Sequence, residues 1–489
     1  MHTTTSATAR TRVAGVLRDG ALNSLIGVTG MVGVAGAMVV TSTSLFLSDA
    51  VRVSPLMIGL FFAARAASEI LSDLVVGALS DRMSNRRSLL ALCAACSAAG
   101  AVAYLLLRDY YALLVAGALF FGIGGAVFSQ LFAYTREFAD SRGTDAAFFN
   151  SALRSVTSVA WIVGPPFGFH LISSRGFSSL FFAAAVCYLL SAALCVTALP
   201  DTAAARPEGG GGAVGGDTAR AGAAHAGPAG SPAGNPAGNP AGNPAGGAPE
   251  GTAAESAAGT ERTAPEQAGM TGPEQAGGVV REQAGAVVPE QAGAVAAVPA
   301  PPRNAFSGLT PRVRSLMAVI VLMLTVNSVY QINIALFVTK DLGLGKGFAG
   351  VLLGLAAALE IPLMIYTGAR AERIGKWRLV TVAAVCATLF FAALPFTGSP
   401  VVLLLLQVPN ALWTAIVLSI PVIILQNAMS DRIGAASALY GASFKAGSFL
   451  GGMTAGSVAQ WLGFTHVFWA CAALSAVAAL LLVTGGRDE

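Results

Sequence analysis

The sequence has too little charge for a soluble protein. Only 11% of its 489 residues are Asp, Glu, Lys or Arg, and 55% are hydrophobic. Soluble globular domains carry about 25% charged residues. The formal net charge is only +4, and no basic face interleaved with aromatic residues points to nucleic-acid binding. The composition therefore excludes a soluble globular fold and favours a membrane protein.

The sequence also lacks the motifs of common enzymes and of ATP-driven pumps. No phosphate-binding loop with Gly-Lys-Ser/Thr is present, and the four histidines are scattered without metal-ligand spacing. Cys93 and Cys96 have the spacing of a redox or metal pair, but no second pair follows, which favours packing. We therefore expect no enzyme activity, no cofactor and no metal, and an energy source other than ATP.

Apolar runs of about 20 residues recur along the chain, and each is long enough to cross a bilayer of about 30 Å as a helix. Backbone groups in lipid must be satisfied within the chain, so each run predicts a helix. The predicted spans are 22–47, 55–78, 88–107, 110–134, 147–172, 177–198, 314–338, 347–369, 377–396, 400–426, 435–460 and 464–484. We predict an all-α integral membrane protein with twelve transmembrane helices in two pseudo-symmetric six-helix bundles.

Four regions follow from these spans. The predicted domains are an N-terminal segment at 1–21, a bundle at 22–200, a linker at 201–311 and a second bundle at 312–485. The linker is rich in Ala, Gly and Pro and repeats the words NPAG and PEQAG. Because it has almost no large apolar residues, it cannot bury a core, and we predict that it is disordered. A docking site for a partner is the alternative.

Basic residues are concentrated in the loops on one side of the predicted spans. These are Arg10, Arg12, Arg18, Arg82, Arg86, Arg87, Arg136, Arg142, Arg303, Arg312, Arg314, Arg370, Arg373, Lys376 and Arg378. The opposite loops carry only Arg52, Arg108, Arg175, Lys340 and Lys346. Cytoplasmic loops carry an excess of Lys and Arg. We therefore predict a multi-pass protein of the cell membrane, with both termini and the linker in the cytoplasm.

A duplicated motif follows the second and the eighth predicted spans. Each copy has a small residue, then an acid and an Arg four and five positions later, then further bases. The residues are Gly77, Asp81 and Arg82 in the first copy and Gly368, Glu372 and Arg373 in the second. The glycine permits close helix packing, and the acid can pair with a base or cap a helix. The motif resembles the loop signature of major facilitator transporters, with Ser84 in place of the usual Gly in the first copy.

Further segments in both halves resemble the bacterial sugar efflux transporter family. They lie at 130–140, 153–166, 327–333, 359–362 and 426–445. This resemblance implies export of sugars such as lactose, glucose and glucosides, in exchange for protons. It also implies that spans two and eleven, and spans five and eight, face each other between the halves.

Charged residues inside the predicted spans are candidate coupling or gating groups. They are Arg65, Glu69, Asp73, Arg154, Glu360 and Lys445. Each is a functional hypothesis because a charge at a helix centre costs about 2.5–3.5 kcal/mol on insertion scales. The first three are spaced i, i+4, i+8, which puts them on one face and lets Arg65 neutralise Glu69. Arg65, Glu69 and Asp73 depart from the pattern of the sugar exporters.

The facing spans predict that Glu69 approaches Lys445 and that Glu360 approaches Arg154. Three roles stay open for these groups. They form salt bridges that hold one face shut, or they bind substrate directly. Alternatively, Glu69 or Glu360 carries a proton, because burial disfavours the charged form of a carboxyl group.

Sugars are bound by amides, carboxylates and aromatic faces. The substrate-binding candidates are Gln130, Asn150, Trp161, Asn327, Tyr330, Gln331, Asn333, Gln407, Asn410 and Trp413. Asn327, Tyr330 and Gln331 share one helical face at i, i+3, i+4, which predicts a pore-lining cluster. For each amide the alternative is a hydrogen bond between helices, and for Trp161 it is an interfacial position or packing.

A proline motif favours export over uptake. The run from Gly164 to Gly168, with Pro165 and Pro166, resembles the Gly-Pro-x-x-Gly signature of facilitator exporters and antiporters. We predict a secondary active transporter that exports sugars or glucosides by alternating access, as a proton antiporter. Its expected partners are a small solute, protons and membrane lipid, without nucleic acid or nucleotide. The alternatives are a drug or metabolite efflux antiporter of the same fold and a non-transporting membrane sensor.

Overall fold

The computed structural model describes residues 20–82, 86–141, 146–200 and 310–484. The predicted N-terminal segment lies outside these residues except for its last two positions. The predicted linker lies outside them except for 310 and 311. The prediction that the linker is disordered therefore remains a prediction.

Six helical segments come before residue 201, and they coincide with the first six predicted spans. They are α2 (Gly20–Phe46) with the π-helical turn η1 (Leu47–Val51), α3 (Pro55–Arg82), α4 (Arg86–Leu106), α5–α7, α8 (Ala146–Arg175) and α9 (Phe177–Thr197). The fourth segment is interrupted, because the π-helical turn η2 (Gly117–Phe121) separates α5 (Tyr110–Ala116) from α6 (Gly122–Gly125) and α7 (Val127–Ser141). Such π-turns often mark functional sites.

Six further segments follow residue 309, again at the predicted spans. They are α10 (Pro311–Leu336) with η4 (Phe337–Asp341), α11 (Lys346–Ile374), α12 (Lys376–Ala393) with η5 (Leu394–Phe396), α13 (Pro400–Leu405) with α14 (Gln407–Ala428), α15 (Ile433–Leu462) and α16 (Phe464–Thr484). The short turn η6 (Ser430–Arg432) joins α14 to α15.

Ten of the helical stretches in the described residues are long and apolar enough to cross a membrane. α3 and α15 are not among these ten. α3 carries the charges at 65, 69 and 73, and α15 is rich in Gly and Ser. The two segments outside this set pack against each other between the halves, in the contact pattern described next.

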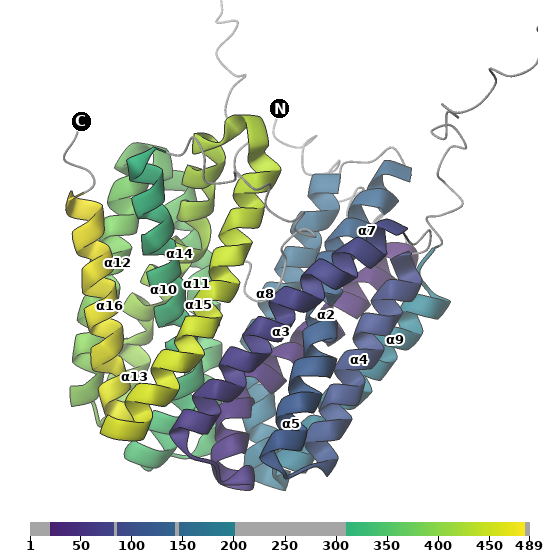
Figure 1. Ribbon diagram of the computed structural model, residues 1–489, viewed down its shortest axis with the longest axis horizontal. Helices are drawn as coiled ribbons and strands as arrows, with labels where there is room; N and C mark the ends of the chain where they lie inside the picture. The colour runs from purple at the N-terminus through teal and green to yellow at the C-terminus, as the bar shows by residue number, and fades with distance from the viewer. Residues whose placement is uncertain (1–19, 83–85, 142–145, 201–309, 485–489) are drawn as a thin grey trace, which may run out of the picture. The chain divides into compact units, whose positions relative to one another are not determined.

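The two halves repeat one packing pattern, as the sequence predicts. In the first half α2 packs against α8 and α9, α4 against α9, and α3 against α6. In the second half α10 packs against α15 and α16, α12 against α16, and α11 against α14. Figure 1 shows the two bundles, the first in purple to blue and the second in green to yellow. Between the halves, α3 packs against α15 and α8 against α11. The predicted facing of spans two and eleven, and five and eight, is thereby confirmed.

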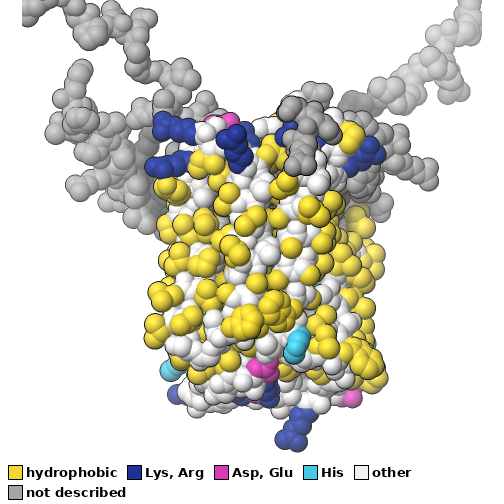
Figure 2. All heavy atoms as spheres, turned by 90° about the vertical axis from the view of Figure 1, so that its left-hand side faces the viewer, with side chains coloured by type: hydrophobic (Ala, Val, Ile, Leu, Met, Phe, Trp, Pro, Cys, Tyr) yellow, Lys and Arg dark blue, Asp and Glu magenta, His cyan; other side chains and the backbone are white. Residues whose placement is uncertain are grey.

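Figure 2 shows an apolar band between two ends that both carry basic residues. We call the end at which α2 and α10 begin the basic end. Its described basic residues are Arg86, Arg87, Arg136, Arg312, Arg314, Arg370, Arg373, Lys376, Arg378 and Arg432. The opposite or far end carries Arg52, Arg108, Arg175, Lys340 and Lys346. Large apolar side chains such as Leu389 and Leu480, which are 66% and 62% exposed, suit contact with lipid.

Glycines bring the two halves into backbone contact near the far end. A Cβ on Gly456 of α15 would lie 2.7 Å from the Cα of Gly59 in α3. A Cβ on Gly350 of α11 would lie 2.7 Å from the Cβ of Phe169 in α8. Small residues allow this close approach of membrane helices. Both contacts between the halves are therefore closely packed on the far-end side.

Candidate functional site

A cavity of about 170 Å³ lies where the two halves meet. Its walls come from helices of both halves, chiefly α2, α3, the segment from η2 to α7, α10 and α15, with α8 contributing Trp161. Three charged residues line it: Arg65, Glu69 and Lys445. Asn327 and Gln331 supply amides. The cavity therefore combines charge, amides and an aromatic ring, the groups that the sequence singled out.

Arg65 and Glu69 form an ion pair along one face of α3. The Nε of Arg65 donates to the Oε1 of Glu69 at 3.0 Å, and the Arg65 and Glu69 side chains are 13% and 26% exposed. The guanidinium also lies 5.1 Å from the ring centroid of Phe121, in the range of a cation–π contact. The Nη1 of Arg65 is buried without a hydrogen-bond partner in the described residues. Arg65 is thus held in place while retaining a donor for a ligand.

Lys445 joins the two halves by an ion pair with Asp73. Both side chains are 13% exposed, and the pair bridges α15 and α3. The sequence predicts instead that Glu69 approaches Lys445. Lys445 does contact Glu69, but through the main-chain oxygen at 3.4 Å. The Glu69 carboxylate is held by Arg65, and Asp73 lies one helical turn nearer the basic end.

The second predicted pair lies on α8 and α11, which pack together. Glu360 is 4% exposed and faces a smaller cavity. Arg154 places its guanidinium 5.5 Å from the ring centroid of Phe132. The approach of Glu360 to Arg154 remains a prediction.

The smaller cavity, of about 40 Å³, adjoins the first, and we call it the side pocket. Trp161, Asn327 and Gln331 line both cavities. The other residues of the side pocket are Thr41, Pro165, Tyr330, Leu353, Ala356, Ala357, Glu360, Asn410, Ala411 and Thr414. The predicted pore-lining cluster at 327, 330 and 331 therefore does face cavities, with Tyr330 in the side pocket alone.

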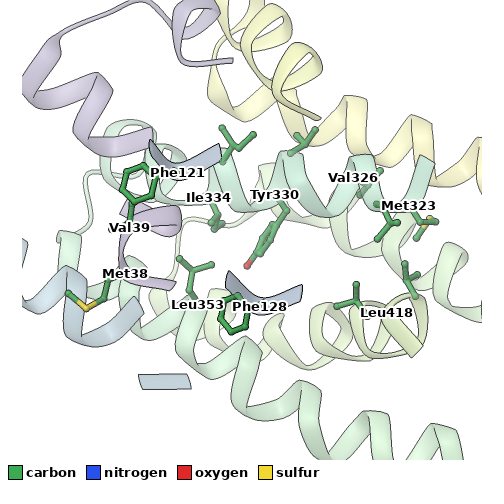
Figure 3. Close-up of a cluster of buried hydrophobic side chains, with 14 of the residues drawn as sticks. Met38, Val39, Phe121, Phe128, Met323, Val326, Tyr330, Ile334, Leu353 and Leu418 are labelled. Carbon is green, nitrogen blue, oxygen red and sulfur yellow. The ribbon is translucent and has the colours of Figure 1, made fainter. Parts of the chain in front are cut away.

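Behind the side pocket, four predicted binding residues satisfy one another. Tyr330 donates its hydroxyl to the Oε1 of Gln407 at 3.0 Å, and the Nδ2 of Asn410 donates to the same oxygen at 2.9 Å. Trp413 donates its Nε1–H to the Oδ1 of Asn410 at 3.0 Å. Figure 3 shows Tyr330 among apolar side chains, including Leu353 and Phe128. Gln407 and Trp413 line neither cavity, so they support the pocket wall.

Two other predicted binding residues form hydrogen bonds between helices, which is the alternative role that the sequence leaves open for each amide. Asn333 donates its Nδ2–H to the carbonyl of Phe464 at 2.8 Å. Gln130 accepts the Ser80 hydroxyl at 2.8 Å, close to an ion pair in which Arg86 Nε lies 2.6 Å from Glu137 Oε1. This network ties α3, α4 and α7 together at the basic end.

The remaining predicted positions lie at the edge of the described structure. The side chains of Asn150, Asp81 and Arg82 lie outside the described residues. In the second copy of the loop signature, the Oε1 of Glu372 lies 2.5 Å from the Nζ of Lys376, and the Glu372 side chain is 72% exposed. The acid of this copy therefore pairs with a base of the same loop, one of the two roles that the motif suggests.

Sequence reasoning missed the aromatic wall of the larger cavity. Phe62, Phe121, Phe128, Tyr188 and Phe444 line it in addition to Trp161. Aromatic residues in apolar helices give no periodic polar signal, so they are indistinguishable in sequence from packing residues. The extra position in η2 also shifts Phe121 relative to a regular helix, which a pattern of period 3.6 does not reveal.

Comparison with known proteins places the chain in a family. The family model described as Major Facilitator Superfamily matches residues 25–400 and 316–488. The chain is 29% identical to sugar efflux transporter A of Escherichia coli, with 92% of each chain covered. It is 28% identical to sugar efflux transporter A of Dickeya chrysanthemi, with 96% of this chain and 97% of that protein covered.

Solved structures share the fold at low sequence identity. The nucleoside transporter NupG aligns with a TM-score of 0.68 and 11% identity, covering 96% of this chain and 99% of that one. A bacterial homologue of the lysosomal transporter Spinster aligns with a TM-score of 0.65 and 13% identity, covering 96% of each. With twelve helical segments in its described residues, a repeated bundle and a family match that spans both halves, the chain is a multi-pass membrane protein that belongs to the Major Facilitator Superfamily, a family of transporters rather than enzymes.

Proposed function

We propose that this chain exports a sugar or glucoside from the cytoplasm by alternating access, in exchange for protons. The observation that carries the proposal is the cavity between the halves, where the Arg65–Glu69 pair and the amides of Asn327 and Gln331 share one space with Trp161. Relatives named sugar efflux transporters, at 25–29% identity over most of the chain, support the substrate class.

The chemistry of the cavity suits a polyol. A sugar presents many hydroxyl groups, which accept from and donate to charged groups and amides, and an apolar ring face that packs on aromatics. Among the described residues, the Nη1 of Arg65 and the Nδ2 of Asn327 have no hydrogen-bond partner, so each can donate to a substrate oxygen. Glu69 supplies acceptor oxygens beside them.

The size of the cavity favours a small solute over a drug. Pockets for drug-sized ligands measure about 300–1,000 Å³. The larger cavity and the side pocket, at about 170 and 40 Å³, lie below this range. The aromatic wall also offers a surface for the apolar substituent of a glucoside.

The contacts between the halves suit alternating access. The far-end side is held by Gly59 against Gly456 and by Gly350 against Phe169. On the basic-end side of the cavity, the Asp73–Lys445 pair crosses the same α3–α15 contact. Export requires the far-end contact to separate after substrate has entered from the basic end, which we place in the cytoplasm.

Protons are proposed to act through Glu69 or Glu360. A proton on Glu69 would neutralise one of the acceptor groups of the cavity and weaken its pairing with Arg65, so proton binding from the outside would favour release of the sugar. Glu360 lies at the side pocket. It precedes Gly368 by eight residues, as Glu69 precedes Gly77, so the two acids are counterparts in the internal repeat. Either acid, once it releases its proton to the cytoplasm, returns to its ion-paired or hydrogen-bonded form.

The experiment that tests the proposal is transport of radiolabelled methyl glucoside into everted membrane vesicles, with and without an acidic interior. We expect the gradient to raise accumulation several-fold in the parent. Glu69→Gln or Glu360→Gln should lose the gradient-driven part while retaining exchange of internal for external sugar. Glu372→Gln, at an exposed acid of the basic end, is the matched control.

Two results would overturn parts of the proposal. If no sugar accumulates in parent vesicles under either condition, sugar export is wrong. If both acid variants keep full gradient-driven accumulation, proton coupling through these acids is wrong. A hydrophobic cation that accumulates in place of the glucoside would support the drug antiporter instead.

A further inference from the structure

The side pocket is a separate recess with its own chemistry. It opens beside the larger cavity, and Trp161, Asn327 and Gln331 form the shared boundary. Its lining includes small side chains, among them Ala357 and Ala411, together with the acid Glu360. No part of the transport mechanism above requires such a recess for the body of a sugar.

Most polar groups of the side pocket are already engaged within the protein. Thr41 donates to the carbonyl of Ala37 at 2.7 Å, and Thr414 donates to the carbonyl of Asn410 at 2.8 Å. Asn410 also donates to Gln407.

Asn327 differs from these groups in its hydrogen bonding. Its side chain is 3% exposed, and its Nδ2 has no hydrogen-bond partner in the described part of the chain. A buried donor without a partner destabilises a protein, which indicates that a ligand or water supplies the missing acceptor.

The size of the pocket limits what that ligand group can be. One water needs about 10–15 Å³ of cavity volume measured in this way, so a pocket of about 40 Å³ holds a group of about three heavy atoms. A pyranose ring is too large for it. A single hydroxymethyl group, with one carbon and one oxygen, fits.

Resting on the sugar export proposed above, we propose that the side pocket is a subsite for the exocyclic hydroxymethyl group of a hexopyranoside. The sugar ring lies in the larger cavity against Trp161. The hydroxyl oxygen accepts from the Nδ2 of Asn327, and its hydrogen is donated to the Glu360 carboxylate. The subsite selects hexopyranosides over pentopyranosides, which lack this group.

The first test uses the parent protein in everted vesicles with three radiolabelled sugars. Methyl glucoside has the hydroxymethyl group, methyl 6-deoxyglucoside keeps the carbon without the hydroxyl, and methyl xyloside lacks both. A missing group in a fitted pocket reduces specificity by about tenfold or more. We expect export at limiting concentration to fall in the order glucoside, 6-deoxyglucoside, xyloside.

Two variants then assign the selectivity to the side pocket. Asn327→Leu removes the donor at similar volume, so the ratio of glucoside to 6-deoxyglucoside export should fall toward one. Ala357→Leu fills the recess, so the ratio of glucoside to xyloside export should fall about tenfold. Ala358→Leu, at the next position of α11 and outside both cavities, is the control and should keep both ratios.

The outcomes separate this inference from the proposed function. If the parent moves none of the three sugars, the proposed function fails. If the parent exports the three sugars equally well, the subsite is wrong while sugar export stands. Because the readout is a ratio within one protein, lower folding yield of a variant does not mimic the predicted result. Unchanged ratios in both Asn327→Leu and Ala357→Leu would also overturn the subsite.

Discussion

The two contacts between the halves are related by the internal repeat but are built differently. In the α3–α15 contact, backbone faces backbone, because Gly59 lies against Gly452 and Gly456. In the α8–α11 contact, a Cβ on Gly354 would meet Pro166 and, at 2.9 Å, the carbonyl oxygen of Ile162. In the α3–α15 contact, glycine therefore packs against glycine. In the α8–α11 contact, glycine packs against the ring of a proline.

The α3–α15 contact also carries an ion pair. Asp73 lies 14 positions after Gly59, about 21 Å along the helix at 1.5 Å per residue. Glycine packing between α3 and α15 therefore closes the far-end side of the cavity. On the basic-end side, an ion pair joins the same two helices. Close packing and charge, which both join the halves, therefore act at opposite ends of one contact.

Breaking the Asp73–Lys445 ion pair should have the largest effect on the free energy of unfolding. Lys445→Gln leaves Asp73 as an uncompensated charge in a largely buried place, and we expect the free energy of unfolding in detergent to fall by about 3–5 kcal/mol. The double variant Asp73→Asn with Lys445→Gln should recover most of this loss, since neither charge remains. Chemical denaturation followed by circular dichroism measures both.

The control for this pair is Glu372→Gln, which breaks the exposed Glu372–Lys376 pair. Surface pairs contribute about 0–1 kcal/mol, so this change should be small. A double variant as unstable as the single one would show that Lys445 stabilises the contact by something other than charge pairing.

Widening the glycine contact should have an intermediate effect. Gly456→Ala places a Cβ 2.7 Å from the Cα of Gly59, and overpacking costs about 1–3 kcal/mol. We expect both stability and sugar export to fall, because the helices can no longer approach at the far end. Gly434→Ala is the matched control in the same helix, where nothing lies within 4 Å of the added Cβ. Equal export by the two variants would contradict a role for close packing.

A pair of ion pairs also joins the halves at the far end, and breaking them should have the smallest effect on stability. Asp49 lies 2.6 Å from Lys340 and 2.7 Å from Lys346, whose side chains are 42% and 36% exposed. Asp49→Asn should lower the melting temperature slightly at low salt, because exposed pairs contribute about 0–1 kcal/mol and are screened.

Salt separates this effect from other polar contacts at the same end. The difference between Asp49→Asn and the parent should vanish at high salt. Asp341→Asn, which changes a carboxylate that accepts from Thr465 at 2.6 Å, should show no such salt dependence. A difference for Asp49→Asn that persists in molar salt would assign its role to hydrogen bonding or packing.

Hydrophobic run length and the family resemblance were sufficient to predict the fold. The twelve predicted spans coincide with helical segments, and the facing of α3 with α15 and of α8 with α11 follows the resemblance. The candidate site was predicted less completely. Helical spacing identified the face shared by Arg65, Glu69 and Asp73, but it does not fix how far α15 is shifted along α3. That axial offset decides that Lys445 pairs with Asp73.

Amides show the same limit of sequence reasoning. Asn327 and Asn333 lie on one helix and look alike in sequence. Asn327 faces both cavities, whereas Asn333 donates to the carbonyl of Phe464. The rotation of α10 against α16 decides between these roles, and a single sequence carries no signal for it.

The π-helical turn at Gly117–Phe121 has a consequence for tolerance of length changes. A π-turn takes up one residue more than an α-turn, so the extra residue is absorbed within the turn between α5 and α6. We expect the loss of one residue within the turn to act mainly on Phe121, the ring beside Arg65. Loss of one residue within α7 instead turns everything after it by about 100°. This span should therefore tolerate shortening within the turn better than shortening within the helix that follows.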